Sequence, residues 1–152
     1  DHACFRSKWI LIMLFYGKPS QYAIRALIYI AENPETPSLA KDIADRENMP
    51  KHFLSKVLKD LVGARMLDSR LGPGGGFWMK KPVDKITLLQ IVRIFEDIDT
   101  SLKTCAIGWA KCSDQSPCGL HHEFKGVRQK VHDYLNTTTL ASLLSAEKDK
   151  RN

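Results

Sequence analysis

The chain has 152 residues, of which 43% are hydrophobic and 26% charged, and its net charge is +6 at neutral pH. This length and balance are those of one ordinary globular domain, and they exclude a fibrous or a disordered chain. The basic excess favours a polyanionic partner such as a nucleic acid.

The N-terminal stretch is expected to lie outside the folded domain. The chain begins with Asp, and basic residues precede an apolar run from Trp9 to Tyr16 that imitates a signal peptide. That run is far shorter than a membrane span of about 20 residues, and no cleavage site follows it. We therefore interpret residues 1–12 as an upstream extension, Met13 as the natural start and Cys4 as irrelevant to function.

Three helices are predicted after this stretch. Apolar residues at helical spacing predict the first, from about Ser20 as its N-cap to Glu32. A proline-rich break separates it from a second, short helix that Ser38 can cap and that ends near Asn48. Pro50 suits the first position of the third helix, because the N–H that proline lacks would be unpaired there.

The third helix has an apolar stripe and a basic face. The stripe consists of Phe53, Leu54, Val57, Leu58 and Leu61. The opposite face carries Lys51, His52, Ser55, Lys56 and Lys59. A helix, a tight turn and a second helix with a basic face form the layout of a helix-turn-helix. A solvated face on a generic helical bundle would have the same pattern.

A glycine-rich turn between two short strands follows. Segments 66–71 and 77–80 are predicted to be the strands, and Gly72 to Gly76 forms the turn. A phosphate-binding loop would need a helix directly after the glycines, and here a strand follows. Between Pro50 and Lys81 the chain carries seven basic and two acidic residues. This concentration of charge indicates a winged helix that neutralises DNA phosphates.

The C-terminal half is predicted to be helical. Thr87 and Gln90 form a capping-box pattern that opens one helix. A long helix from about Leu120 to Leu135 carries a stripe that serves either as core or as a dimer seam. Thr139 can cap a last short helix, and residues from 147 onward are predicted to fray. The stripe consists of Leu120, Phe124, Val127, Val131 and Leu135.

Soft metal ligands gather in the loop before the long helix. The pattern Cys105-x6-Cys112-x5-Cys118-Gly-Leu-His121 offers three thiols and an imidazole, which prefer zinc or iron-sulfur centres. A zinc site has suitable ligands here but lacks the usual Cys-x2-Cys knuckle. A metal-free redox switch is a further alternative. Bunched thiols in a chain that needs no disulfides indicate a reducing, cytoplasmic setting.

Several segments resemble one family. Gln21 to Leu27, the wing Arg70-Leu71-Gly72-Pro73-Gly74-Gly75-Gly76-Phe77, Ile86-Thr87 and the three loop cysteines are similar to bacterial winged-helix regulators. That family includes the iron-sulfur cluster regulator and the nitric-oxide-sensing repressor, and the likeness covers roughly residues 13 to 145. It implies a homodimer that binds near-palindromic promoter sites in double-stranded DNA, with an iron-sulfur cluster that alters DNA affinity.

The resemblance also implies a ligand set. In the nitric-oxide-sensing relatives an acidic residue near the start of the first helix completes the cluster across the dimer, and Gln21 stands at that position here. His121 instead matches the histidine of the cluster-regulator branch, and His122 is interpreted as an exposed helix residue. This favours a 2Fe-2S cluster, with a 4Fe-4S cluster as the alternative, held by Cys105, Cys112, Cys118 and His121.

These observations predict a mainly α fold with a small β-hairpin wing. Residues 13–86 would form the winged helix-turn-helix, residues 87–145 the cluster loop and dimerisation helices, and residues 146–152 a tail. We expect a transcriptional regulator, most simply a repressor, that senses redox, nitric oxide or iron-sulfur status and has no membrane partner. The expected DNA-binding residues are Lys51, His52, Ser55, Lys56, Lys59, Arg70, Gly74 and Gly75.

A different class of function is a small metalloenzyme that uses the Cys/His site with Glu123 as its acid/base. No open coordination position or cofactor motif accompanies the site. The sequence therefore favours the regulator.

Overall fold

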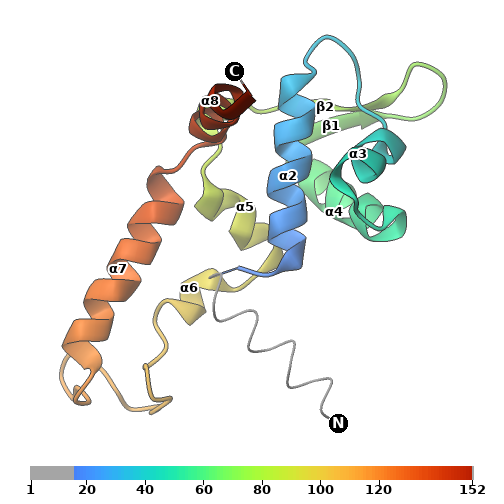
Figure 1. The fold of residues 1–152 in the computed structure, drawn as a ribbon. Helices are drawn as coiled ribbons and strands as arrows, with labels where there is room; N and C mark the ends of the chain where they lie inside the picture. Colours follow the sequence, from blue (N-terminus) through green and yellow to red (C-terminus); the bar gives the residue numbers. More distant parts are fainter. Residues whose placement is uncertain (1–15, 152) are drawn as a thin grey trace.

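The computed structural model describes residues 16–151, and its elements follow the order of a winged helix succeeded by a helical C-terminal half (Figure 1). The expectations for residues 1–12, Met13 and Cys4 lie outside the described residues. Among the described residues, no helix has both the length and the apolarity that a bilayer crossing requires.

Helix α2 (Lys18–Glu32) is the central element of the fold, because α3, α4, α5 and α8 all pack against it. Its buried face includes Ala23, Leu27 and Ile30. The helix begins at Lys18 with Gly17 as its N-cap, so the prediction of Ser20 as N-cap is wrong. Ser20 lies inside the first turn, fully buried, and its hydroxyl donates to Glu96.

Helices α3 (Ala40–Glu47) and α4 (Lys51–Gly63) form the predicted helix-turn-helix. The turn between them places Asn48 in the left-handed conformation (φ 50°), which asparagine tolerates at a helix C-terminus. Pro50 is the N-cap of α4 rather than its first residue. Of the predicted stripe on α4, all but the half-buried Phe53 are buried.

The wing is an antiparallel hairpin of β1 (Leu67–Arg70) and β2 (Gly76–Met79). Leu67 pairs with Met79, and Arg70 pairs with Gly76. Gly75 closes the turn where no side chain fits, because a Cβ there would lie 2.1 Å from the Arg70 carbonyl oxygen. The glycine-rich composition of the wing is therefore a steric requirement of its tight turn.

A short backbone contact joins the wing to the helix-turn-helix. The Ser38 N–H donates to the Phe77 carbonyl at 2.8 Å, and the Phe77 N–H donates to the Ser38 carbonyl at 2.9 Å. Ser38 was expected to cap the second helix, but Leu39 occupies the N-cap position of α3. The two hydrogen bonds therefore connect β2 of the wing to the segment that leads into α3.

The C-terminal half begins with a 3-10 turn, η1, and ends with the helix α8. Both predicted caps are confirmed, because Thr87 accepts from the Gln90 N–H and Thr139 accepts from the Ser142 N–H. Helix α6 was not predicted, and α8 continues past residue 146, where the sequence analysis placed a tail. The elements are η1 (Val83–Lys85), α5 (Leu88–Phe95), α6 (Ile98–Ser101), α7 (His121–Thr137) and α8 (Leu140–Arg151).

Helix α7 leads away from the winged helix, and α8 then packs on α2 and η1 (Figure 1). Val131 and Leu135 are buried near the end of α7, which packs against α5. Leu120 and Val127, farther along the same predicted stripe, are 47% and 49% exposed. The stripe therefore divides into an inner part that joins the core and an outer part that faces solvent.

Candidate metal centre and nucleic-acid interface

The loop between α6 and α7 carries the cysteines and lies at the far end of the molecule from the wing (Figure 1). Backbone hydrogen bonds fold it into successive turns. The Gly108 N–H donates to the Cys105 carbonyl at 3.0 Å, and the Cys112 N–H donates to the Trp109 carbonyl at 3.2 Å. Because each turn reverses the chain, thiols that are distant in sequence come to face one another.

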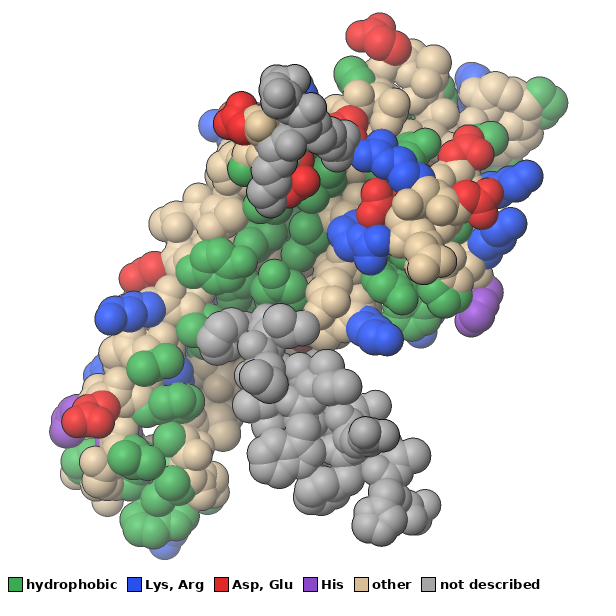
Figure 2. Space-filling view, viewed as in Figure 1, with side chains coloured by type: hydrophobic (Ala, Val, Ile, Leu, Met, Phe, Trp, Pro, Cys, Tyr) green, Lys and Arg blue, Asp and Glu red, His purple; other side chains and the backbone are tan. Residues whose placement is uncertain are grey.

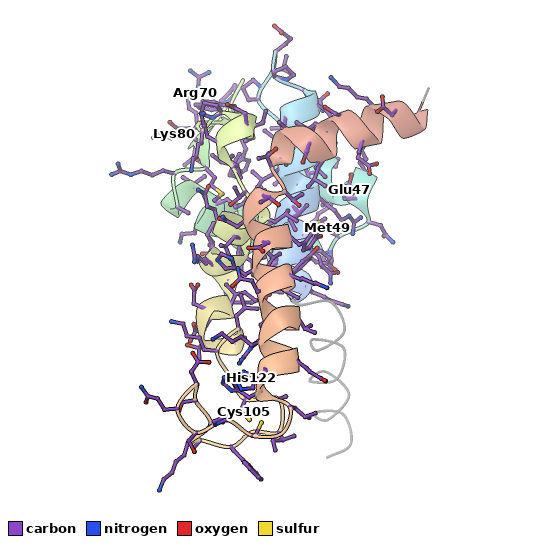
Figure 3. The ribbon with its side chains drawn as sticks, turned by 90° about the vertical axis from the view of Figure 1, so that its left-hand side faces the viewer. Glu47, Met49, Arg70, Lys80, Cys105 and His122 are labelled. Atoms are coloured by element: carbon purple, nitrogen blue, oxygen red, sulfur yellow. The ribbon has the colours of Figure 1, made fainter. Side chains whose placement is uncertain are left out.

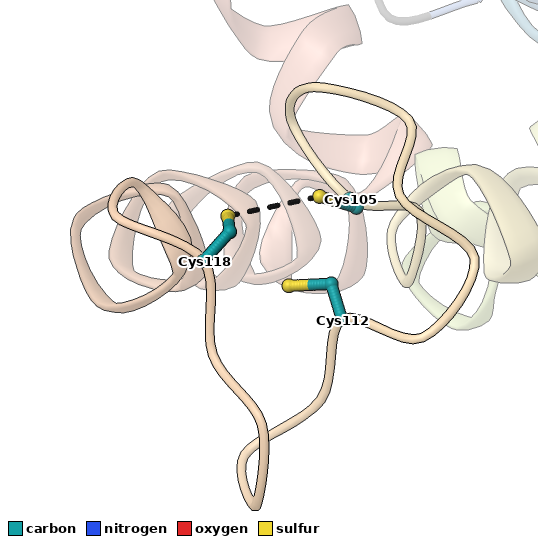
Figure 4. Close-up of side chains that lie close together, drawn as sticks. All are labelled: Cys105, Cys112 and Cys118. Atoms are coloured by element: carbon teal, nitrogen blue, oxygen red, sulfur yellow. Dashed lines mark hydrogen bonds between the residues drawn. The ribbon is translucent and has the colours of Figure 1, made fainter.

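The three thiols converge on one point (Figure 4). The sulfur atoms of Cys105, Cys112 and Cys118 all lie within 4.8 Å of one another. Cys105 Sγ and Cys118 Sγ are 3.7 Å apart. Two thiolates on one tetrahedral metal atom, each about 2.3 Å from it, would lie about 3.8 Å apart. The donor set therefore fits a metal centre of the soft, thiolate-binding kind.

His121 joins this group through Cys112. Its Nδ1 lies 3.1 Å from Cys112 Sγ, and its side chain is only 8% exposed. His121 is the first residue of α7, so the helix presents it to the loop. His122 is exposed, as expected, and lies at the foot of α7 near the loop that carries Cys105 (Figure 3).

Asp114 is a site residue that the sequence reasoning missed. Its Oδ1 accepts from His121 Nε2 at 2.9 Å, and both of its carboxylate oxygens accept from Lys125 Nζ, at 2.7 and 2.9 Å. The bonds from Lys125, and then from His121, hold the pKa of Asp114 at about 2. The sequence analysis interpreted Asp114 only as a residue that favours a turn. Its partners could not be predicted because they are brought to it by the tertiary structure.

The backbone around Cys105 stabilises the thiolate form of this residue. The backbone N–H of Ile107, and after it that of Trp109, stabilise the thiolate and lower the pKa of Cys105 to about 7. The thiolate is the form of cysteine that ligates metals or attacks oxidants. Trp109 itself is 63% exposed on the outside of the loop.

A cavity of about 490 Å³ opens beside the thiols. Its walls include Cys112 and His121 on the loop side and the basic Lys125 and Arg128 from α7. Arg128 also fixes the root of the loop, because its Nη1 donates to the Thr104 carbonyl at 2.7 Å. Of the three thiols, Cys112 thus lines this open cavity, together with His121.

The predicted DNA-facing residues of α4 are exposed in the structure. Lys51, His52, Ser55, Lys56 and Lys59 all lie on its outer face. The Ser55 hydroxyl donates to the Lys51 carbonyl at 2.9 Å, which leaves its oxygen free to accept. Figure 2 shows basic side chains along the edge of the molecule formed by α3 and α4, with acidic side chains between them.

The wing presents a mixed surface. Arg70 is exposed, and its Nη2 donates to the Gly74 carbonyl at 3.3 Å, so the guanidinium lies over the turn. Leu71 next to it is 96% exposed. Gly75 is buried and its N–H donates to the Gly72 carbonyl, so it serves the wing by closing its turn.

Comparison with known proteins places this arrangement among transcription regulators. A protein of Aquifex aeolicus described as an HTH-type transcriptional regulator is 31% identical over 136 residues, which cover 88% of this chain and 94% of the relative. The HTH-type transcriptional regulator IscR of Erwinia tasmaniensis is 27% identical, with 82% of this chain and 75% of the relative covered.

A solved structure confirms the fold. CymR, described as the global cysteine regulator of B. subtilis, superimposes with a TM-score of 0.70 at 24% identity over 86% of this chain and 95% of CymR. A likeness at this identity shows the winged-helix architecture alone. The family model for Rrf2, an iron-dependent transcriptional regulator, matches residues 16–146. The chain therefore belongs to the Rrf2 family, and it is a transcriptional regulator rather than an enzyme.

Proposed function

We propose that this protein is a homodimeric, cytoplasmic repressor whose promoter affinity is controlled by an iron-sulfur cluster that senses redox, nitric oxide or iron-sulfur status. The observation that carries the proposal is the convergence of three thiols, joined by His121, in a chain that also has a winged helix. The cytoplasm keeps such thiols reduced and therefore able to bind metal.

The donor set supports a cluster bound by Cys105, Cys112, Cys118 and His121. Three thiolates supply negative charge, and the neutral imidazole is the weaker donor. Histidine ligands are known on 2Fe-2S centres, which favours that type over 4Fe-4S. A bound cluster supplies a centre that changes oxidation state and reacts with oxygen or nitric oxide.

The DNA surface follows from the exposed faces of α4 and the wing. Lys51, His52, Ser55 and Lys56 would enter the major groove, and Lys59 would contact phosphate. Arg70 would reach into a narrow minor groove, whose negative potential attracts a guanidinium. The exposed Gly74 would bring the wing backbone close to the DNA, and the buried Gly75 would assist indirectly by closing the turn.

The dimer surface is proposed for the exposed side of α7. Leu120, Val127 and Tyr134 are 47%, 49% and 46% exposed and stand seven positions apart. Seven residues make nearly two helical turns, so these side chains share one face, as in a two-helix seam. A second copy of α7 would cover them, and Val127→Glu should give a monomer where the exposed Lys130→Glu does not.

The test is a comparison of loaded and empty protein, purified without oxygen. We expect a visible absorption spectrum, iron and sulfide in equal amounts, and a promoter affinity that changes when the cluster is removed. Protein that holds zinc alone, or whose DNA affinity is the same with and without iron, would show that the sensing proposal is wrong, although the DNA-binding family assignment would stand.

A metal-free thiol switch in the same fold is the second candidate, and the 3.7 Å between the sulfur atoms of Cys105 and Cys118 favours it. In this reaction two thiols and one peroxide molecule give a disulfide and two water molecules. Peptide mapping after peroxide treatment of metal-free protein tests it, since a Cys105–Cys118 disulfide should form and Cys112 should stay reduced. A zinc-stabilised regulator would instead contain one zinc ion and no sulfide.

A further inference from the structure

The side chain of Asp114 stands behind His121, on the side away from the thiols. Its Oδ1 is 2.9 Å from His121 Nε2, whereas His121 Nδ1 is 3.1 Å from Cys112 Sγ. The two nitrogens of one imidazole ring thus have different partners. The inference that follows rests on the proposed function, in which His121 is a metal ligand.

The chemistry of the two partners decides where the imidazole proton sits. An ionised carboxylate can only accept a hydrogen bond, so Nε2 must carry the hydrogen. A neutral imidazole has a single N–H, and Nδ1 is then left with a free lone pair directed at Cys112. This nitrogen faces one of the three convergent thiols, so it is the ring nitrogen on the side where the thiols would hold a metal.

Lys125 holds Asp114 in this position. It comes from α7, one helical turn after His121, and its ammonium group contacts both carboxylate oxygens of Asp114. The loop residue is therefore fixed to the same helix that presents the histidine. Asp114 and Lys125 are both exposed, whereas the His121 ring is 8% exposed.

We propose that Asp114, anchored by Lys125, is a positioning residue that selects Nδ1 of His121 as the metal-binding nitrogen and strengthens it as a donor. A carboxylate behind a ligating histidine fixes its tautomer and raises its basicity, and removing such a partner typically lowers metal affinity by about 10- to 100-fold. Water can reach the exposed side of this pair and replace the carboxylate as an acceptor. The expected loss is therefore near the lower end of that range, about 10-fold.

Cobalt(II) is a suitable probe, because it accepts thiolate and imidazole ligands and its absorption bands report the ligands. Reduced, metal-free protein is titrated with cobalt in competition with a chelator. Asp114→Ala should lower the cobalt affinity about 10-fold. Asp114→Asn keeps an accepting oxygen but loses the charge, so its cobalt affinity should lie between those of Asp114→Ala and the wild type. The thiolate-to-cobalt band should keep its intensity in both variants, which shows that the loop still folds around the three thiols.

A matched control is Asp133→Ala. Asp133 is an exposed carboxylate on α7 that accepts from Gln129 Nε2 at 2.9 Å and lies 3.5 Å from His132 Nδ1, both on α7. This variant loses the same charge and should bind cobalt as the wild type does.

A second readout needs no metal. Nitrogen NMR of the His121 ring in reduced, metal-free protein should show the Nε2–H tautomer in the wild type and a mixture of tautomers in Asp114→Ala. Wild-type affinity together with an unchanged tautomer in Asp114→Ala would overturn the positioning role.

His121→Ala separates this inference from the proposed function. A loss of cobalt affinity in His121→Ala without any loss in Asp114→Ala would overturn the positioning role alone. If His121→Ala binds cobalt as tightly as the wild type, His121 is not a metal ligand, and the positioning role of Asp114 is overturned with it.

Discussion

The Glu96 carboxylate accepts a hydrogen bond from the Ser20 hydroxyl at 2.9 Å, although the two residues are 76 positions apart. The same oxygen accepts from the N–H of Gly17, which is the N-cap residue of α2. Glu96 follows α5 directly and precedes the loop that carries the thiols. The segment between α5 and α6, which leads toward the proposed sensing loop, is thus fixed to the first turn of α2.

Glu96→Ala should therefore destabilise the fold by about 1–3 kcal/mol, because Ser20 is fully buried and would lose its partner. Urea unfolding of the single variants and of Ser20→Ala/Glu96→Ala measures the coupling. We expect a coupling of at least about 0.5 kcal/mol, as for residues in direct contact. Additive losses would show that the two side chains act independently.

The basic face of α4 should contribute to DNA affinity without regard to sequence. Replacing Lys56 with Ala removes one phosphate contact and should reduce the slope of log affinity against log salt by about 1. Binding titrations at several salt concentrations, on promoter and random DNA, measure this slope. Lys130→Ala on the outer face of α7 is the control, and an unchanged slope in Lys56→Ala would mean that this face does not contact phosphate.

Arg70 should act differently, through sequence or groove shape. Arg70→Ala should cost about 1–3 kcal/mol on the best promoter site and much less on random DNA. Lys80→Ala removes a charge from the residue that follows β2 and should weaken both complexes equally. If Arg70→Ala also weakens both equally, the arginine does no more than neutralise charge.

The four proposed ligands should differ in their effect on the cluster. Cys112→Ala should prevent stable assembly, because a thiolate that holds the metal is lost. His121→Ala should still assemble a cluster on three cysteines but lose it faster in air. Iron and sulfide analysis of protein purified without oxygen, followed in time after exposure to air, distinguishes the variants. Full iron content in Cys112→Ala would exclude the proposed ligand set.

Alkaline pH should loosen the contact between the N-terminal part of the domain and α7. Burial, and then a hydrogen bond with Tyr134, raise the pKa of Tyr16 from 10.0 to about 12. The fold favours the protonated phenol, so its contribution to stability is complete below pH 10 and is lost as the pH rises from 10 to about 12. Unfolding curves across this window should show a steeper decline for the wild type than for Tyr16→Phe.

The parts of the fold that depend on neighbouring residues could be predicted from the sequence. The N-cap at Thr87 requires only a hydroxyl three positions before the backbone N–H that it binds. The turn of the wing requires only glycine at Gly75, where the Arg70 carbonyl leaves no room for a side chain. The thiols were predicted to converge because nothing in the loop extends the chain. Helix α6 was missed because four residues are too few to show a helical period.

Contacts between distant residues could not be predicted. Serine is a favoured N-cap residue, but Ser20 lies inside α2, where its hydroxyl is bonded to Glu96. Gly17 is the N-cap instead. Asp114 gains its role from Lys125 and His121, which lie on another element and have no periodic relation to it. A sequence pattern records which residue types are present, whereas these roles depend on which residues the fold brings within about 3 Å.

Trp109 stands exposed on the thiol loop, while Trp78 belongs to β2 of the wing. Each end of the molecule thus carries its own native fluorophore, and Trp9, the third tryptophan of the chain, lies outside the described residues. Emission from Trp109 overlaps the absorption of iron-sulfur centres, so it would be quenched as the loop is loaded, whereas Trp78 would respond to DNA. Trp78→Phe can therefore follow metal loading and Trp109→Phe can follow promoter binding, each in real time and without an added label.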